Sequence, residues 1–467
     1  MANWSWARRR ARARLTVPLV GVALAATVTG TGLLAPEARA LPGAETWAAE
    51  LSVAGGDDTN VVAADGAIRL GTGNDRPLST RSPQAQGELV LPPRRPATAT
   101  TRVSATVTAD VPPGASVDVD VRGTRSDGSW GEWTSTTPGA PAVLEEPATD
   151  VQVRVTLVAG DSAASPSLRR LVLDAEPSAT TAPTPETGAP DTTETPGTTG
   201  TTAPSTSTPS TPGPRTANPG TTTPSTGTGR ATTPTGPLFA PPFQARVFAS
   251  RVGLVGNSTA NGHVVTPHDR FVALPSGRVR APRGTGDYTV QVCNGGRCAW
   301  APVWDVGPWN VKDDYWSSQQ ARQQWGALAQ GLPEAQAAYQ GKFNGGRDGF
   351  GRTVRNPAGI DLGDGTYWDD LGMTGNGWVT VSYLWTGRGA TGIARPGTAS
   401  LVPVRNAPRA TAAQVGGVAP TARVYVACSA TGQTLSGSQG TSNQWLRIAP
   451  NMFVTASMVE APRVAAC

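Results

Sequence analysis

The sequence comprises 467 residues and carries a formal net charge of +5, from 39 basic and 34 acidic side chains. That excess lies wholly in residues 1–40, which hold six arginines and one glutamate, so the rest of the chain has 33 of each sign. A chain of near-zero net charge offers phosphate backbones little attraction. We therefore expect no nucleic acid among the partners.

Residues 1–40 have the three parts of a secretory signal peptide. An arginine-rich segment, residues 8–14, precedes a small and apolar stretch, residues 15–35, and Ala38-Arg39-Ala40 forms a small-x-small cleavage site. A membrane anchor is the alternative, and Pro18 with several Gly and Thr residues disfavours a span. We expect a protein that is secreted or associated with the cell wall, with no membrane span after signal removal.

Residues 41–176 are predicted to form a β-sandwich accessory domain. Apolar and polar residues alternate in several runs that turn residues separate, which is typical of antiparallel strands with one buried face. The clearest runs are residues 102–108, 117–121 and 151–155. Trp130 and Trp133 suggest a sugar-stacking platform, and core or edge packing is the alternative interpretation.

Residues 177–236 differ sharply in composition from their neighbours. They contain Pro, Ser, Ala, Thr, Glu, Gly, Asp, Arg and Asn, but neither aromatic nor branched aliphatic residues. Such a segment has no side chains whose burial would offset the entropy of ordering. We expect a disordered, partly extended linker between two folded parts.

Four cysteines indicate two disulfide bonds in an exported chain, with three arrangements open in principle. Cys293 and Cys298 flank residues 294–297 (NGGR), a predicted hairpin turn, so we expect a bridge across that hairpin. Cys428 then pairs with Cys467. A zinc site is the alternative, but no histidine pair lies near these cysteines, and we expect no metal.

Tryptophan is concentrated after the linker. Eight of the fourteen tryptophans lie between Trp300 and Trp385. Aromatic faces stack on the flat C–H surface of sugar rings, so a tryptophan-lined groove is one interpretation, and structural packing is the other. The side chains that would lead such a groove are Trp304, Trp309, Trp316 and Trp368.

Four short segments resemble, in the right order, motifs of the double-psi β-barrel family, which includes expansins and rare-lipoprotein-A-like lytic transglycosylases. They are residues 259–262 (TANG), 271–275 (FVALP), 304–309 (WDVGPW) and 359–362 (GIDL), the last followed by residues 371–373 (LGM). The resemblance covers about residues 250–387. We therefore expect residues 237–405 to form a six-stranded double-psi β-barrel.

The resemblance also implies a site and a substrate class. It makes Asp361 the proton donor and Asp305 its partner in a groove, since acid–base cleavage of a glycosidic bond uses two carboxylates. It implies peptidoglycan or another cell-wall glycan as the partner, without a cofactor. The residues expected to contact the glycan are Thr259, His263, Trp304, Trp309 and Trp368.

Some positions depart from the family pattern. His263 stands where the transglycosylases carry Glu, and His268 lies three residues upstream of the family's histidine. Residues 310–358 are an insertion, and its Gln- and Ala-rich part, Ser317–Gln340, is predicted to be helical. A metal site at the two histidines and Asp269 is the alternative, but hydrogen bonding at the groove wall is the expected role of the histidines.

The tail, residues 406–467, is predicted to be a separate small β domain. Residues 423–428, 432–437 and 441–448 have the pattern of strands. The Thr-Ser-Asn-x-Trp segment resembles bacterial SH3-like domains, which commonly bind wall peptides, and Trp445 is then a core residue. The cross-link at Cys428 would support so small a core.

Three functions remain open from the sequence. The barrel is an enzyme, a lytic transglycosylase or glycosidase that uses Asp361 and Asp305; or it binds or loosens wall polymer without cleavage, as expansins do. In the third, the barrel is structural, with Asp361 capping a helix and Asp305 bracing the turn at Gly307. His263 favours the second function, and the aspartate pair favours the first.

Overall fold

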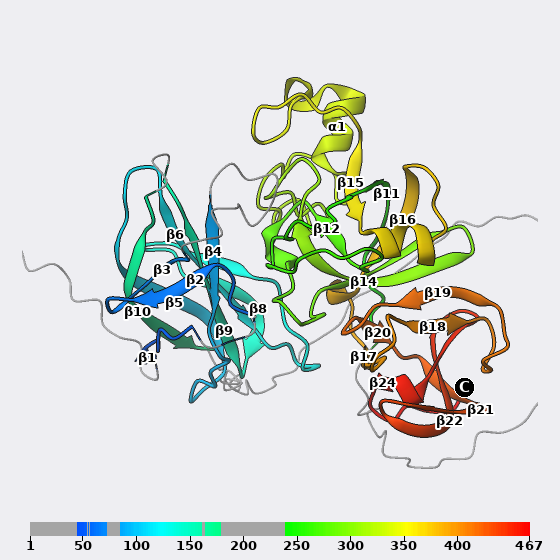
Figure 1. The fold of residues 1–467 in the computed structure, drawn as a ribbon. Helices are drawn as coiled ribbons and strands as arrows, with labels where there is room; N and C mark the ends of the chain where they lie inside the picture. Colours follow the sequence, from blue (N-terminus) through cyan, green and yellow to red (C-terminus); the bar gives the residue numbers. More distant parts are fainter. Residues whose placement is uncertain (1–43, 54, 56, 72–84, 161–163, 179–238) are drawn as a thin grey trace, which may run out of the picture. The chain divides into compact units, whose positions relative to one another are not determined.

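A computed structural model describes residues 44–53, 55, 57–71, 85–160, 164–178 and 239–467 (Figure 1). The predicted signal peptide and nearly all of the predicted linker lie outside these residues. The described residues belong to one compact unit, Gly43–Cys467, and are mostly β, as expected. None of their helices is long and apolar enough to cross a membrane.

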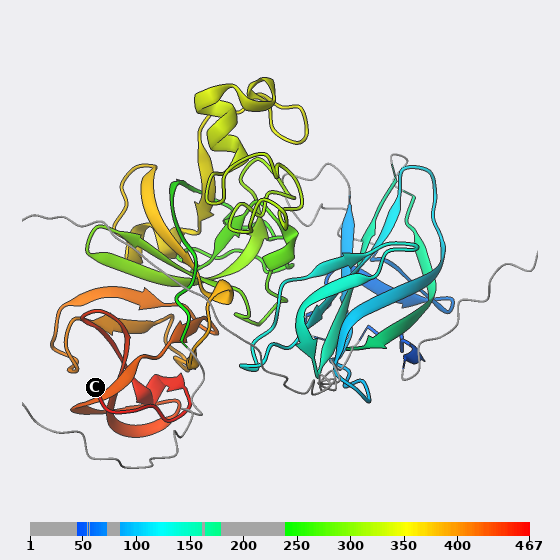
Figure 2. The same ribbon diagram turned by 180° about the vertical axis from the view of Figure 1, so that it is seen from behind.

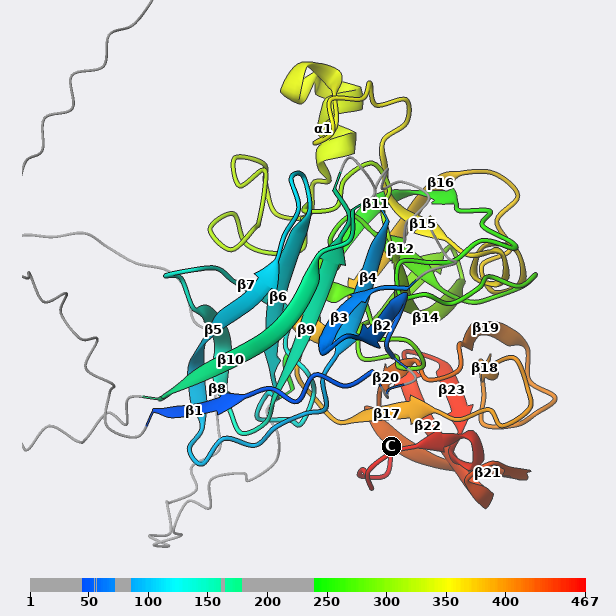
Figure 3. The ribbon, with the colours of Figure 1, turned by 60° about the vertical axis from the view of Figure 1, so that its left-hand side comes forward.

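Residues 44–178 form two antiparallel sheets, called the N-terminal sheets below (Figure 3). The six-stranded sheet contains β1 (Glu45–Ala48), β2 (Val61–Ala64), β3 (Ala67–Leu70), β5 (Thr100–Asp110), β8 (Ala142–Ala148) and β10 (Ser167–Pro177). The four-stranded sheet contains β4 (Gln86–Val90), β6 (Ser116–Gly123), β7 (Thr134–Thr136) and β9 (Val151–Val158). Apolar residues of both sheets, such as Val103 of β5 and Leu157 of β9, share one buried cluster.

Six later strands close into a barrel. They are β11 (Gln244–Arg251), β12 (Val272–Leu274), β13 (Thr289–Asn294), β14 (Arg297–Val306), β15 (Ala358–Leu362) and β16 (Gly377–Tyr383). Their order is β12-β15-β11-β16-β13-β14, and β12 also pairs with β14, which closes the ring. Alternate residues such as Val247, Val292 and Ile360 fill the interior. The six-stranded barrel expected from the sequence is thus confirmed.

The insertion between β14 and β15 is mostly irregular, so the helix predicted over Ser317–Gln340 is largely wrong. The one α-helix of the described residues, α1, covers only Glu334–Gly341 (Figures 1 and 2). Pro333 stands directly before it, and the turns ahead are organised by polar contacts. There the Arg322 guanidinium pairs with buried Asp313, whose second oxygen accepts the Glu334 N–H at 2.7 Å.

Short helical turns complete the chain between the strands. They span Gly277–Val279, Phe343–Gly346, Gly365–Asp370, Leu384–Thr386 and Ala456–Met458. The turn at Gly365–Asp370 is π-helical and directly follows β15. It ends directly before residues 371–373 (LGM).

The tail consists of eight strands, drawn in orange and red (Figure 2). They are β17 (Thr391–Ala394), β18 (Val402–Arg405), β19 (Gln414–Val418), β20 (Arg423–Tyr425), β21 (Cys428–Gly437), β22 (Gly440–Ala449), β23 (Met452–Thr455) and β24 (Val459–Glu460). Although β17 and β18 precede residue 406, they pair with β20, β24, β19 and β23. The sheets of the tail therefore begin at Thr391.

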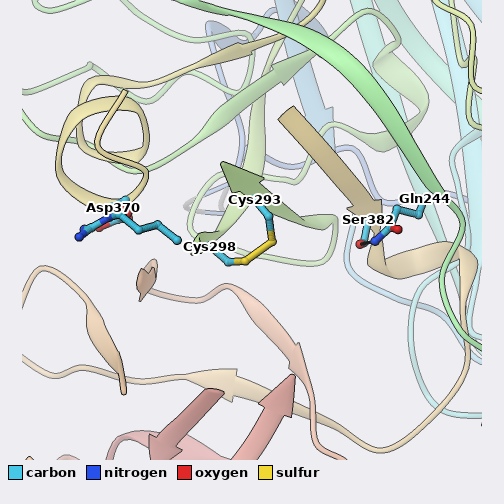
Figure 4. The surroundings of a disulfide bond; sticks show 6 residues. Gln244, Cys293, Cys298, Asp370 and Ser382 are labelled. Atoms are coloured by element: carbon cyan, nitrogen blue, oxygen red, sulfur yellow. Dashed lines mark hydrogen bonds between the residues drawn. A yellow bond between two sulfur atoms is a disulfide. The ribbon is translucent and has the colours of Figure 1, made fainter. Parts of the chain in front are cut away.

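Both predicted disulfides are present. Cys293 and Cys298 face each other across the β13–β14 hairpin (Figure 4), and Cys428 is joined to Cys467. Each bridge lies within one part of the chain, the first in the barrel and the second in the tail. The described residues contain no free cysteine.

The N-terminal sheets meet the barrel through buried polar groups. Glu132 accepts the indole N–H groups of Trp316 and Trp385, at 2.8 and 2.9 Å, and lies 3.2 Å from the Arg278 guanidinium. Burial raises the pKa of Glu132, although Arg278 opposes that rise. Trp133 is only 1% exposed. This contact, the sheet–barrel interface, therefore combines hydrogen bonds and ion pairs with apolar packing of Trp133 and Val90 against the barrel core.

The tail meets the barrel differently, through a continued sheet. Strand β19 pairs in parallel with β14, with Gly416 opposite Cys298. Apolar residues of the barrel and the tail share one buried cluster that includes Trp300 and Val418. This contact is called the tail–barrel interface below.

Two tryptophan interpretations are corrected by this packing. Trp316, expected to lead a sugar groove, is 1% exposed and packs in the barrel core, with its indole N–H bound to Glu132. Trp133 is enclosed between the guanidinium groups of Arg122 and Arg154, at 4.4 and 4.6 Å from its ring. Neither ring face is available to a sugar.

Candidate functional site

Asp305 and Asp361 lie on either side of one residue of β12. Ala273 is the register partner of Asp305 on β14 and of Asp361 on β15. Partners at the same level of a sheet point to the same face, and two strand spacings separate the outer backbones by about 10 Å. The two aspartates therefore share one face of the barrel wall, as expected.

That face is the outer one, because of an irregularity in β14. Val272 pairs with Val303, but the next pair is Ala273 with Asp305, so Trp304 is the extra residue of a bulge. Val303 points into the barrel core. In a regular strand the side chain two residues further along points to the same face, so without the bulge Asp305 would also point inward. The bulge thus brings Asp305 to the face that Asp361 occupies.

Both carboxylates are buried, each 1% exposed. Residues 252–271, called the roof below, contain a small apolar cluster that includes Leu254 and Phe271. The roof's Ala260 N–H donates to Asp305 at 2.9 Å, and the Ser250 hydroxyl of β11 donates to Asp361. The pair lies beneath the roof and not in the open groove that the sequence suggested.

Thr259 belongs to the internal structure of the roof. Its side chain is fully buried, and its hydroxyl donates to the Asn261 side-chain oxygen at 2.7 Å. Asn261 in turn donates to the Ala281 carbonyl at 3.1 Å. Thr259 therefore fixes the turn that presents the Ala260 N–H to Asp305.

His263 is a partly accessible histidine of the roof, with a side chain 30% exposed. Its Nε2 lies 2.7 Å from an Asp269 oxygen, and its ring centroid lies 4.5 Å from that of Trp304. Burial alone would raise the pKa of Asp269, but hydrogen bonds from His263 and Thr266 outweigh it and lower that pKa. His263 and Asp269 thus form a hydrogen-bonded pair within the roof.

His268 belongs to a different cluster. Its Nδ1 lies 2.9 Å from Asp369, while Arg270 pairs with Asp370 at 3.0 Å. Burial raises the pKa of Asp370 to about 6, although Arg270 opposes the rise. The two histidines therefore have separate carboxylate partners. Across the described residues, no three His, Cys, Asp or Glu side chains are grouped to hold a metal ion.

The remaining tryptophans of the expected site differ in exposure. Trp368 is 43% exposed, and the Arg251 guanidinium, itself paired with Asp364, covers one ring face at 4.2 Å. Trp304 is half-buried and stacks on Phe271 with centroids 5.5 Å apart. Trp309 is also half-buried and donates to Asn356 at 2.9 Å, within the insertion. Trp304 and Trp368 are thus the two that retain access to solvent around β12 and β15.

The N-terminal sheets hold the roof from outside. Arg280 donates to the Ala260 carbonyl at 3.1 Å and pairs with Glu88 of β4. Thr59 donates to the Asn261 carbonyl at 3.1 Å. Burial lowers the pKa of Arg280 to about 10, and the nearby Asp305 charge opposes that change. Two residues from the first third of the chain therefore help to fix the turn above Asp305.

Several of these residues were not identified from the sequence. Ser250 lies in an apolar strand, and Glu88, Thr59 and Arg280 carry no motif that links them to a site. Asp269 stood out only because it adjoins His268. Apart from the local contact of Asp269 with His263, each contact depends on how distant segments pack, which no local pattern encodes.

Comparison with known proteins identifies a family match over the barrel, but that family has no described activity. Residues 243–382 match a family described as Domain of unknown function (DUF8814). The match runs from the start of β11 to the end of β16 and so coincides with the closed barrel. No curated protein matches the chain.

Proposed function

We propose that this protein is exported and binds and remodels peptidoglycan through its barrel. The observation that carries the proposal is the placement of Asp305 and Asp361 at one level of the barrel wall, on one face, across Ala273. Glycosidases that invert configuration hold their carboxyl groups about 6.5–9.5 Å apart. Side chains that lean together across a single strand can reach that range. The two disulfides are compatible with an extracellular protein.

Cleavage requires the roof to lift, because a buried acid cannot deliver a proton to a bulky glycan. Asp361 would then donate the proton and Asp305 would assist, while His263 and Trp304 contact the sugar at the edge of the roof. Trp368 extends the same region with an exposed ring. The tail, with its resemblance to SH3-like domains, would add affinity for wall peptides.

A second function, binding or loosening of wall polymer without cleavage, also has support. Both aspartates are 1% exposed and already hydrogen-bonded within the fold. His263 stands where the transglycosylases carry Glu. In this case Asp305 and Asp361 anchor the roof, and the glycan is held by the side chains outside it.

Release of soluble fragments from insoluble peptidoglycan separates the two functions. If the barrel cleaves, the mature protein releases muropeptides, with anhydro ends for a transglycosylase and reducing ends for a hydrolase. Asp361→Asn abolishes release but retains binding, since it removes the proton donor with little change in volume. The matched control is Asp369→Asn, a partly exposed carboxylate that pairs with His268, and it retains release.

The other outcomes are equally informative. Binding without release by the wild type selects the second function. Release that survives both Asp361→Asn and Asp305→Asn rejects the proposed mechanism. Absence of binding to any wall polymer leaves only a structural role for the barrel.

A further inference from the structure

A cavity lies where the barrel, the start of β11 and the tail come together, and neither Asp305 nor Asp361 lines it. Its volume is about 530 Å³, within the range of small-ligand sites. The side chains around it are those of Phe239, Pro241, Pro242, Gln244, Gln291, Trp300, Ser382, Leu384, Tyr425, Ala427, Arg447, Ile448, Ala449 and Pro450.

The floor of the cavity is one row of side chains across four barrel strands. Gln244 of β11 pairs with Ser382 of β16, Ser382 pairs with Gln291 of β13, and Gln291 pairs with Trp300 of β14. Their neighbours Ala245, Val290 and Val381 point into the barrel core, so by alternation this row points outward. Figure 4 shows Gln244 and Ser382 beside each other near the hairpin disulfide.

The row offers hydrogen-bonding groups that the fold does not use up. Gln244 donates to the Ser382 hydroxyl at 2.9 Å, which leaves its side-chain oxygen and one N–H. Within the described part of the chain, the half-buried Gln291 side chain makes no hydrogen bond. Planar amides can donate and accept at once, which suits neighbouring hydroxyl groups.

The walls are aromatic and carry one charge. Phe239 is 67% exposed and meets Tyr425 edge to face, with ring centroids 6.1 Å apart. The Tyr425 hydroxyl donates to the Leu384 carbonyl at 2.8 Å, which fixes the ring. Arg447 is the sole charged residue that lines the cavity, and its exposed guanidinium has no ion-pair partner among the described residues.

We propose that this cavity binds one sugar unit that carries a carboxylate. Arg447 pairs with the carboxylate, Gln244 and Gln291 bind hydroxyl or amide groups, and the ring of Phe239 or Tyr425 packs on the C–H face. The choice of an acidic sugar follows from a lone positive charge beside two amides that keep hydrogen-bonding groups available and beside an aromatic wall. The ligand class rests on the proposed function, since wall glycan contains N-acetylmuramic acid, whose carboxylate is free where the peptide stem has been removed, but the aspartates take no part.

Titration of the full mature protein with N-acetylmuramic acid, followed by NMR or calorimetry, tests this site. N-acetylglucosamine, which lacks the carboxylate, should bind at least tenfold more weakly. Arg447→Ala and Gln291→Ala should each weaken N-acetylmuramic acid at least tenfold. Arg409→Ala, an exposed arginine outside the cavity, is the matched control and should leave affinity unchanged.

The results that overturn the proposal are specific. They are no binding of N-acetylmuramic acid, equal loss in Arg409→Ala and Arg447→Ala, or tighter binding of the zwitterionic dipeptide D-alanyl-D-alanine, which also carries a carboxylate, than of the sugar. Circular dichroism of each variant confirms that it remains folded. Asp361→Asn should keep this affinity, so failure of the barrel to act on peptidoglycan and failure of this cavity are distinguishable.

Discussion

The barrel meets its two neighbours in opposite ways. At the sheet–barrel interface, charged and polar groups are buried, among them Glu132, Arg278 and the Arg280–Glu88 pair. At the tail–barrel interface, a sheet continues from β14 into β19 and apolar side chains fill the space. Buried ion pairs stabilise little compared with apolar packing, but they are costly to break on one side only.

The contrast indicates different tolerances to change. The sheet–barrel interface is sensitive to the loss of any polar partner. The tail–barrel interface is sensitive to changes in side-chain volume and to anything that separates the backbones of β14 and β19. Asp287 belongs to both, since its carboxylate accepts from Arg122 of β6 at 2.9 Å and from Arg423 of β20 at 3.1 Å. Burial would raise the pKa of Asp287, but the two arginines outweigh it and lower that pKa.

The largest expected effect is loss of Glu132. Glu132→Ala leaves two buried indole N–H groups without their acceptor and removes one of the two carboxylates beside Arg278, which keeps its pair with Asp314. We therefore expect a loss of about 3–5 kcal/mol in the free energy of unfolding. Denaturant unfolding of the mature protein measures it. Asp110→Ala is the control, because Asp110 pairs with Arg169 and both side chains are exposed, 71% and 46%, so the change should cost about 1 kcal/mol or less. An equal loss of unfolding free energy in the two variants would contradict the claim that buried polar partners matter more than exposed ones.

The second effect follows from removing each disulfide, one in the tail and one in the barrel. The Cys428–Cys467 bridge closes a sequence separation of 39 residues and Cys293–Cys298 one of 5. Loop entropy then predicts stabilisation of about 4 and about 2 kcal/mol respectively. When Cys428 and Cys467 are both changed to Ser, limited proteolysis should cleave the tail first. Cleavage that begins in the N-terminal sheets, which contain no cysteine, would be contrary to this account.

The third effect concerns backbone proximity at the tail–barrel interface. A Cβ at position 416 would collide with the Cys298 carbonyl, so Gly416→Ala should cost about 1–3 kcal/mol through forced separation of β14 and β19. Gly296→Ala, in the hairpin turn, is the control because a Cβ there meets nothing within 4 Å. Thermal unfolding compares the two. A tolerated Gly416→Ala would mean that β19 does not pair closely with β14.

The smallest effect is a pH dependence near the same interface. Burial raises the pKa of Asp370 from 3.8 to about 6, so the folded state holds this proton more tightly than the unfolded state. Its contribution to stability is therefore full below about pH 4 and is lost as pH rises through about 6. Asp370→Asn should flatten the stability profile over that window by at most about 1.4 kcal/mol per pH unit. An unchanged profile in Asp370→Asn would exclude Asp370 as its source.

Much of the fold could be predicted from local patterns. Two-residue alternation located strands in the N-terminal sheets and the tail, and the turn between Cys293 and Cys298 identified a disulfide that the structure contains. The insertion was predicted less well. Gln and Ala suggested a helix over residues 317–340, but Gly326, Gly331 and Pro333 interrupt it, and the Arg322–Asp313 pair holds turns there instead.

The candidate site was predicted in part. Asp305 and Asp361 were identified as a pair, and they do lie across one strand. Their burial was not foreseen, because it depends on a bulge at Trp304 and on a roof that is held by Arg280 and Thr59. These are contacts between segments far apart in the sequence, and composition and spacing carry no record of them.

The central claim, that the barrel recognises cell-wall glycan, is tested most directly by co-sedimentation of the mature protein with purified, insoluble peptidoglycan. The account predicts saturable binding that soluble peptidoglycan fragments compete away. It also predicts weaker binding for Trp368→Ala, which removes an exposed ring, than for Tyr339→Ala, which removes a similarly exposed ring on α1. Protein that stays in the supernatant at every concentration would contradict the claim.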